Sequence, residues 1–145
     1  MRRVSPHSVW IGHDGDGRNF PELHESDVQA VVQLAIEEPA IQPPRDLVFL
    51  RIPLSDGAGN PSESLILAVR TVAQLIGLGI PTLVCCGAGM SRSPCIVAAA
   101  LSLALQLTPE EALDQVKNSG PCDIAPSLWA ETRELLAAWR SDVGL

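Results

Sequence analysis

Basic residues and long apolar segments are both scarce in this chain. Ten lysines and arginines stand against seventeen aspartates and glutamates, which gives a formal net charge of −7 over 145 residues. Nucleic acids and anionic membranes are bound by extended basic faces, and ten scattered cations do not provide one. The longest apolar segment, residues 95–107, is interrupted by Ser102 and Gln106 and is too short to span a bilayer. We therefore expect neither a nucleic acid nor a membrane as partner.

The amino terminus lacks the features of a secretory signal. The chain begins with a basic segment, Met1-Arg2-Arg3, but residues 4–8 contain serines, a proline and a histidine. A signal peptide needs an unbroken apolar segment at that place. We therefore expect a cytoplasmic protein.

The four cysteines lack the spacing of a metal site or a disulfide framework. Cys85 and Cys86 are adjacent, Cys95 follows nine residues after Cys86, and Cys122 is distant. Structural zinc sites use pairs such as Cys-x-x-Cys, and none occurs here. In a cytoplasmic protein such cysteines are thiols that serve packing or chemistry. No metal or other cofactor is expected.

The rest of the chain alternates between strand-like and helix-like segments. Asn60, Pro61 and Glu63 have the pattern of a helix start, with Asn60 as the N-cap. Residues 13–19 form a polar stretch that we interpret as a loop. Strands are predicted at 9–12, 28–35, 47–53 and 80–86, and helices at 61–78, 92–106, 109–118 and 128–140. This order predicts a single α/β domain over residues 1–145, with three layers and a central, mostly parallel sheet of four to five strands flanked by helices.

One stretch, from Thr82 to Pro94, has the composition of an anion-binding loop. An apolar strand ends at Cys86, glycines follow at 87 and 89, and a helix begins near Arg92. We name residues 87–91 the anion loop. Its amide groups and the positive end of the helix would converge on a phosphate-sized dianion. Five residues separate Cys86 from Arg92, so a thiol and a fork-shaped cation can face the same anion.

These surroundings favour a reactive thiolate at Cys86. A cysteine has a reference pKa of about 8.5, and helix N-termini and neighbouring cations lower it to about 3.5–7.5. A thiolate beneath a bound phosphate is placed for in-line attack, and departure of an alkoxide then needs an acid on the opposite side. Asp56 follows a predicted strand in a glycine-flanked loop and is our first candidate for that acid. The competing acids are Asp14, Asp16 and Asp123.

The segment from Cys86 to Ser93 resembles the signature of the cysteine-based protein tyrosine phosphatase superfamily. That signature is a cysteine, five residues, an arginine and then serine or threonine, and the Ala-Gly-x-Ser-Arg-Ser form here is most similar to the dual-specificity branch. Residues 9–12, 52–56 and 107–112 resemble the family's opening strand, acid-bearing segment and penultimate helix start. Asp56 precedes Cys86 by thirty residues, which is similar to the separation in the family.

The resemblance implies a phosphatase acting through a phosphocysteine intermediate. Cys86 would be the nucleophile, Arg92 the phosphate clamp and Asp56 the acid that later activates water, while Ser93 would donate a hydrogen bond to the departing thiolate. The residues implied to bind the phosphate are Gly87, Ala88, Gly89, Met90, Ser91 and Arg92. The substrate would be a phosphorylated protein or a small phosphate ester. The family mechanism uses no metal.

Two departures from the family pattern leave alternatives open. The family usually has a histidine before the nucleophile, where this chain has Cys85, so a catalytically weak module that only binds phosphoproteins is a second hypothesis. A rhodanese-like sulfurtransferase, which also uses a loop cysteine, is a third. The chain contains no tyrosine, so the tyrosine that lines the deep pocket of strict phosphotyrosine enzymes is absent and a shallow pocket is expected.

Overall fold

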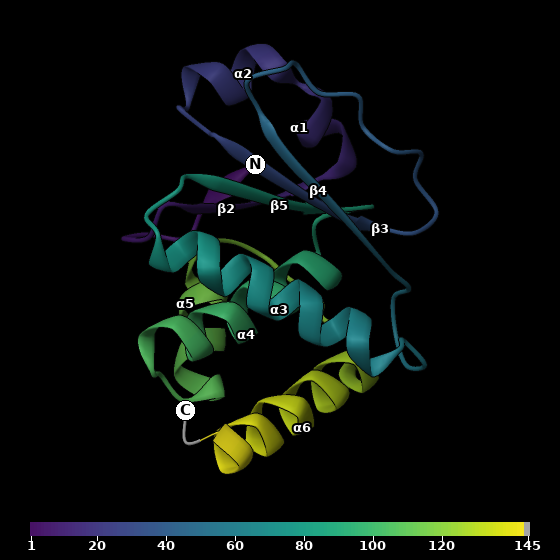
Figure 1. Cartoon of the computed structure of the whole chain (residues 1–145), viewed down its shortest axis with the longest axis vertical. Helices are drawn as coiled ribbons and strands as arrows, with labels where there is room; N and C mark the ends of the chain where they lie inside the picture. Colours follow the sequence, from purple (N-terminus) through teal and green to yellow (C-terminus); the bar gives the residue numbers. More distant parts are fainter. Residues whose placement is uncertain (144–145) are drawn as a thin grey trace.

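In the computed structural model, which describes residues 1–143, a five-stranded sheet separates two groups of helices (Figure 1). The strands are β1 (Arg2–Arg3), β2 (Val9–His13), β3 (Ala30–Ala35), β4 (Val48–Leu54) and β5 (Thr82–Cys86). The helices are α1 (Asp14–Arg18), α2 (Phe20–Glu25), α3 (Ser62–Gly77), α4 (Arg92–Leu105), α5 (Pro109–Asn118) and α6 (Pro126–Val143). Helices α1 and α2 cover one face of the sheet, and α3 to α6 lie on the other (Figure 1).

The strand order places the end of β5 in the middle of the sheet. The order is β1-β2-β5-β3-β4, and every pair is parallel except the antiparallel pair of β1 and β2. All residues of β3 and β5 are buried, as expected for central parallel strands that are covered on both faces. His13 of β2 lies in register with Cys86 of β5. The three-layer, mostly parallel α/β fold expected from the sequence is therefore confirmed.

Helix α4 connects this sheet to the remaining helices. Its first eleven residues, 92–102, are all buried, in agreement with the apolar sequence of this helix. It packs against α3, α5 and α6 as well as against the sheet. A central helix of this kind holds its own first turn, and therefore the anion loop before it, in a fixed position. No helix within residues 1–143 combines the length and hydropathy that a membrane span requires.

The interpretation of residues 13–19 as a loop is wrong, because α1 covers most of them. The Nδ1 of His13 accepts a hydrogen bond from the amide of Asp16 at 3.2 Å, and the Asp16 carboxylate accepts one from the His13 amide at 3.0 Å. This is a reciprocal helix cap built from unusual residue types. A Cβ on Gly17 would lie 2.9 Å from the sulfur of Cys85, so the glycine lets α1 pack closely against the sheet.

The expected helix cap at Asn60 is also wrong. Helix α3 begins one residue later, with Pro61 at the N-cap position and no side-chain hydrogen bond to the cap. The Asn60 side chain instead accepts a hydrogen bond from the amide of Ser55 and donates one to the carbonyl of Ser55, each at 2.8 Å. An asparagine side chain can cap a helix or hydrogen-bond to a loop backbone, and here Asn60 bonds to the loop before the helix.

Candidate active site

The anion loop connects the end of β5 to the start of α4 and rests against the end of β2. Gly89 has a φ of 73°, and a Cβ there would lie 2.8 Å from the backbone carbon and oxygen of Gly12. Only glycine fits this position, because both the backbone conformation and the space exclude a side chain. The amide of Asp14 also donates a hydrogen bond to the carbonyl of Gly87 at 3.4 Å. The loop is thereby braced from the β2 side.

Cys86 is the last residue of β5 and lies almost completely buried beneath the loop. It is 2% exposed, and its sulfur accepts a hydrogen bond from the amide of Ser93 at 3.4 Å. That amide belongs to the first turn of α4, where amide groups have no partner within the helix. The hydroxyl of Ser93 is buried and has no hydrogen-bond partner among residues 1–143. It is therefore free to donate a further hydrogen bond at the base of the loop.

Arg92 is held by a carboxylate that the sequence did not single out. Its two terminal nitrogens donate hydrogen bonds of 2.6 Å each to the two carboxylate oxygens of Glu37, and one of them also donates to the carbonyl of Leu54 at 2.9 Å. Arg92 is 6% exposed, and its Nε has no partner among the described residues. Burying a hydrogen-bond donor without a partner costs free energy, so this nitrogen indicates that an anion binds here.

The pair of Glu37 and Arg92 is ionised over the working pH range. Hydrogen bonding to Arg92 lowers the pKa of Glu37 to about 2, against an ordinary value of 4.5. The same bonds raise the pKa of Arg92 above its ordinary value. Glu37 lies two residues after the end of β3. An acidic residue at the carboxyl end of a strand beside the anion loop was the signal that could have identified it, since these strand ends meet in a parallel sheet.

Asp56 approaches the anion loop from the segment between β4 and α3. The hydroxyl of Ser91 donates a hydrogen bond of 2.6 Å to Oδ1 of Asp56. The segment 55–60, here named the acid loop, is closed on itself by Asn60, whose amide nitrogen reaches the carbonyls of both Ser55 and Gly57. The acid loop thus lies over the site with its carboxylate already engaged.

One cavity of about 230 Å³ unites most of the expected residues. It is lined by Asp56, Cys86, Ala88, Met90, Ser91, Arg92 and Asp123. Of the competing acids, only Asp123 also lines it. Asp14 is buried elsewhere and binds Arg18 at 2.8 Å, and Asp16 caps α1. No group of three or more possible metal ligands lies together within residues 1–143.

Cys85 faces the opposite side of the sheet from Cys86. It packs in the smaller apolar cluster with Val31, Ile41 and Leu83. Burial raises the pKa of the Cys85 thiol to about 12, with the charge of Asp14 acting in the same direction. The residue that replaces the family's histidine is therefore a neutral, packed side chain, which agrees with the alternation expected along a strand.

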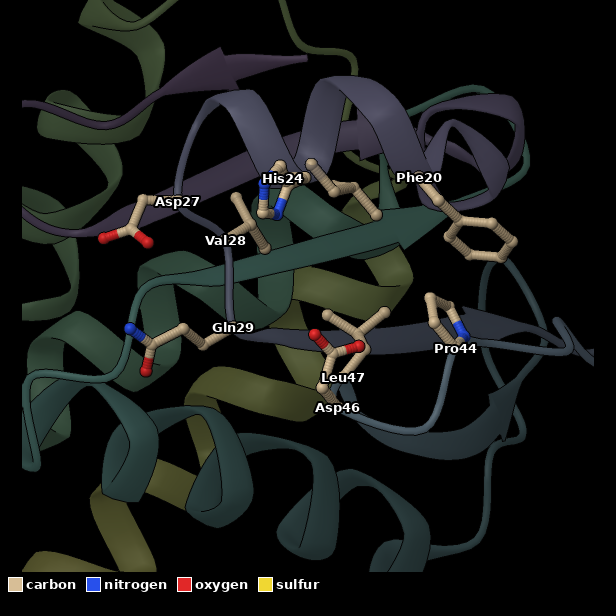
Figure 2. A pocket seen from close by; sticks show the side chains of 9 residues that line it. Phe20, His24, Asp27, Val28, Gln29, Pro44, Asp46 and Leu47 are labelled. Atoms are coloured by element: carbon tan, nitrogen blue, oxygen red, sulfur yellow. The ribbon is translucent and has the colours of Figure 1, made fainter.

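A second hollow, of about 260 Å³, lies where β3 and β4 begin (Figure 2). It is bounded by α2 and by the residues that precede β3 and β4, among them Gln29 and Leu47. The anion loop follows the opposite end of a parallel strand. Asp27 and Asp46 line this hollow, and no cysteine or arginine does. Both hollows contain two carboxyl groups, but only the cavity at Cys86 also contains a thiol and an arginine, so it is the candidate site for phosphate chemistry.

Comparison with known proteins identifies relatives of this chain. The family model described as "Polymorphic toxin system, DSP-PTPase phosphatase" matches residues 12–104, which include β3, β4, β5, the acid loop, the anion loop and most of α4. Dual specificity protein phosphatase 22 of Xenopus tropicalis is 31% identical over 128 residues, which cover 84% of this chain and 57% of that protein. The chain therefore matches little more than half of that relative's length.

Solved structures share the fold over nearly the whole chain. Human DUSP28 has a TM-score of 0.85 at 24% identity, and the similarity covers 97% of this chain and 99% of that one. A mouse putative dual specificity phosphatase, solved as a complex with zinc tungstate, has a TM-score of 0.84 at 22% identity, with 97% and 88% covered. Since the family model spans more than half of the sequence, the chain belongs to the DSP-PTPase family of the cysteine-based protein tyrosine phosphatase superfamily.

Proposed function

We propose that this protein hydrolyses phosphomonoesters through a phosphocysteine intermediate on Cys86. The observation that carries the proposal is a single cavity lined by the thiol of Cys86, the guanidinium of Arg92 and the carboxyl group of Asp56. These are a nucleophile, an anion clamp and an acid, the three groups that phosphoryl transfer to a side chain requires. Family membership supports the same reaction class.

In the first step, the thiolate of Cys86 attacks phosphorus, and the bond from phosphorus to the ester oxygen breaks. Asp56 gives its proton to the leaving oxygen, so an alcohol or phenol departs rather than its anion. The unpaired Nε of Arg92 and the amides of the anion loop donate to the equatorial phosphate oxygens, where charge is spread in the transition state.

In the second step, water attacks the phosphocysteine and the bond from sulfur to phosphorus breaks. Asp56, now a carboxylate, accepts a proton from that water and is restored as an acid. The sulfur leaves as a thiolate, which accepts the hydrogen bond from the Ser93 amide and one from the free Ser93 hydroxyl. Inorganic phosphate is the second product, and no cofactor takes part.

We further propose that the substrate is a phosphorylated protein or a small phosphate ester with one phosphate near the reacting centre, met in the cytoplasm. The cavity lining contains one cation, Arg92, and two carboxyl groups, Asp56 and Asp123. The charge of Arg92 is already balanced by Glu37. A substrate with further phosphates around the first would meet repulsion rather than additional cations.

The test is hydrolysis of p-nitrophenyl phosphate by the wild type and by Cys86→Ser, with Cys122→Ser as the matched control. Cys122 is half-buried and does not line the cavity. We expect Cys86→Ser to lose at least about 1,000-fold in kcat and Cys122→Ser to keep the wild-type rate. Acid quenching during turnover followed by mass spectrometry should find phosphate on the peptide that contains Cys86. Equal rates for the wild type and Cys86→Ser would overturn the proposal.

A second variant tests the acid. Asp56→Asn should lower kcat for phenyl phosphate, whose phenolate needs a proton to leave, by about 100-fold. Inhibition by orthovanadate should stay close to that of the wild type, because the anion loop is unchanged. An unchanged kcat would remove Asp56 from this role. Phosphopeptide binding without turnover in the wild type would favour the binding module instead, and sulfur transfer from thiosulfate would favour the sulfurtransferase.

A further inference from the structure

Ser91 joins three segments that are distant in sequence. Its hydroxyl donates to Oδ1 of Asp56 at 2.6 Å and accepts a hydrogen bond from the amide of Ala125 at 2.9 Å. Asp56 belongs to the acid loop, Ser91 to the anion loop and Ala125 to the segment just before α6. Ser91 is 8% exposed, so water contributes little to these contacts.

The two bonds fix the direction of the hydroxyl proton. A serine hydroxyl carries one hydrogen and two lone pairs. The amide of Ala125 can only donate, so it occupies a lone pair of the Ser91 oxygen and leaves the hydroxyl hydrogen for another acceptor. Oδ1 of Asp56 is the acceptor at hydrogen-bond distance. With the hydroxyl hydrogen in this bond, Oδ1 is the acceptor and Oδ2 is the oxygen available for a proton.

This direction decides which oxygen of Asp56 carries the catalytic proton. If Oδ1 were protonated, it would donate to Ser91, and the hydroxyl hydrogen of Ser91 would have to leave its present acceptor. Protonation at Oδ2 disturbs neither bond. The acid proton is therefore held on Oδ2, the oxygen that Ser91 does not occupy.

We propose that Ser91 is a positioning residue that presents the Oδ2 proton of Asp56 to the leaving oxygen of the substrate. This inference rests on the proposed phosphatase activity, and it explains how the carboxyl group of Asp56 is oriented for proton transfer. The Ala125 amide orients the hydroxyl, the hydroxyl holds Oδ1, and the rigid carboxyl plane then directs Oδ2. In the second step the same bond supports the carboxylate that receives the proton of water.

The test uses substrates that differ in their need for an acid. A nitrophenolate leaves readily without a proton, whereas a phenolate does not. We expect Ser91→Ala to lower kcat/KM, which reports the step in which the alcohol leaves, by about tenfold for phenyl phosphate and by less than about threefold for p-nitrophenyl phosphate, where tenfold corresponds to about 1.4 kcal/mol. Orthovanadate should inhibit with unchanged potency, which shows an intact anion loop. Ser55→Ala, in the same acid loop but with only its backbone in the bonds described, should behave as the wild type.

A double variant separates positioning from a general structural effect. If Ser91 acts through Asp56, then Ser91→Ala should lower kcat/KM for phenyl phosphate no further once Asp56→Asn is present. Independent losses in the double variant would overturn the proposal, and so would equal losses on both substrates with weaker orthovanadate inhibition. If the wild type is active but Ser91→Ala gives either of these results, only the inference about Ser91 fails and the phosphatase proposal still holds. A wild type no faster than Cys86→Ser overturns both.

Discussion

Arg92 is a buried cation whose charge is balanced before any substrate binds. The two bonds of 2.6 Å to Glu37 fix the plane of its guanidinium, and the Nε remains free toward the loop. We expect Glu37→Gln to lower kcat/KM for an aryl phosphate by about tenfold, or about 1.4 kcal/mol of transition-state stabilisation, because a planar clamp loses its fixed orientation. Glu38→Gln, at the neighbouring residue, is the control and should keep the wild-type value. A matching loss in both variants would contradict a specific role for Glu37.

The same variant has a pH signature in stability. Pairing with Arg92 lowers the pKa of Glu37 to about 2 in the folded protein, whereas the ordinary value is 4.5. A lowered folded pKa stabilises the protein above the unfolded value, and this contribution disappears as the pH falls from about 4.5 to about 2. The difference in free energy of unfolding between the wild type and Glu37→Gln, measured in urea, should therefore be constant above pH 5 and shrink toward pH 2. The Glu37 side chain is 52% exposed, so salt should reduce the difference.

Residues of the site differ in how readily the sequence reveals them. Cys86 and Arg92 are separated by five residues in one loop, so their spacing along the sequence is enough to predict that they lie together. Asp56 needed the additional assumption that neighbouring strands end at the same edge. Glu37 has the same signal at the end of β3, but its role depends on a bond to a distant guanidinium. Ala125 acts through its backbone amide and has no sequence signal. Their contributions exist only in the folded chain.

At the scale of elements, the anion loop depends on the close approach of β2. Gly89→Ala should abolish orthovanadate binding and most activity, because its Cβ would lie 2.8 Å from the Gly12 backbone. Gly79→Ala is a matched control, since Gly79 has a φ of 71° but no atom within 4 Å of its Cβ position. Both variants bear a left-handed backbone penalty of about 1–2 kcal/mol, which thermal unfolding should show. Only Gly89→Ala should lose activity. Equal activity in the two would show that the contact with β2 is not needed.

The elements that were predicted correctly share strong periodicity and burial. The central strands are buried throughout, as are the first eleven residues of α4, and their sequences are mostly apolar. Helix α1 was missed because glycines and aspartates are poor helix formers. Its formation depends on the mutual cap of His13 and Asp16 and on packing against Cys85. The secondary structure of residues 14–18 is therefore determined by tertiary contacts and not by local propensity.

At the scale of the whole molecule, the charge of −7 and the two carboxyl groups of the cavity oppose the approach of an anionic substrate. Raising the ionic strength from about 0.01 to 0.15 M shortens the screening length from about 30 to about 8 Å, which removes most of this repulsion. For a phosphopeptide with acidic flanking residues, kcat/KM should therefore rise with salt by several-fold. For a peptide of equal length with lysine and arginine flanks it should fall, because attraction is screened instead. The rate at saturating substrate should change little for either. Parallel salt responses of the two peptides would show that the charge of the molecule does not select its substrates.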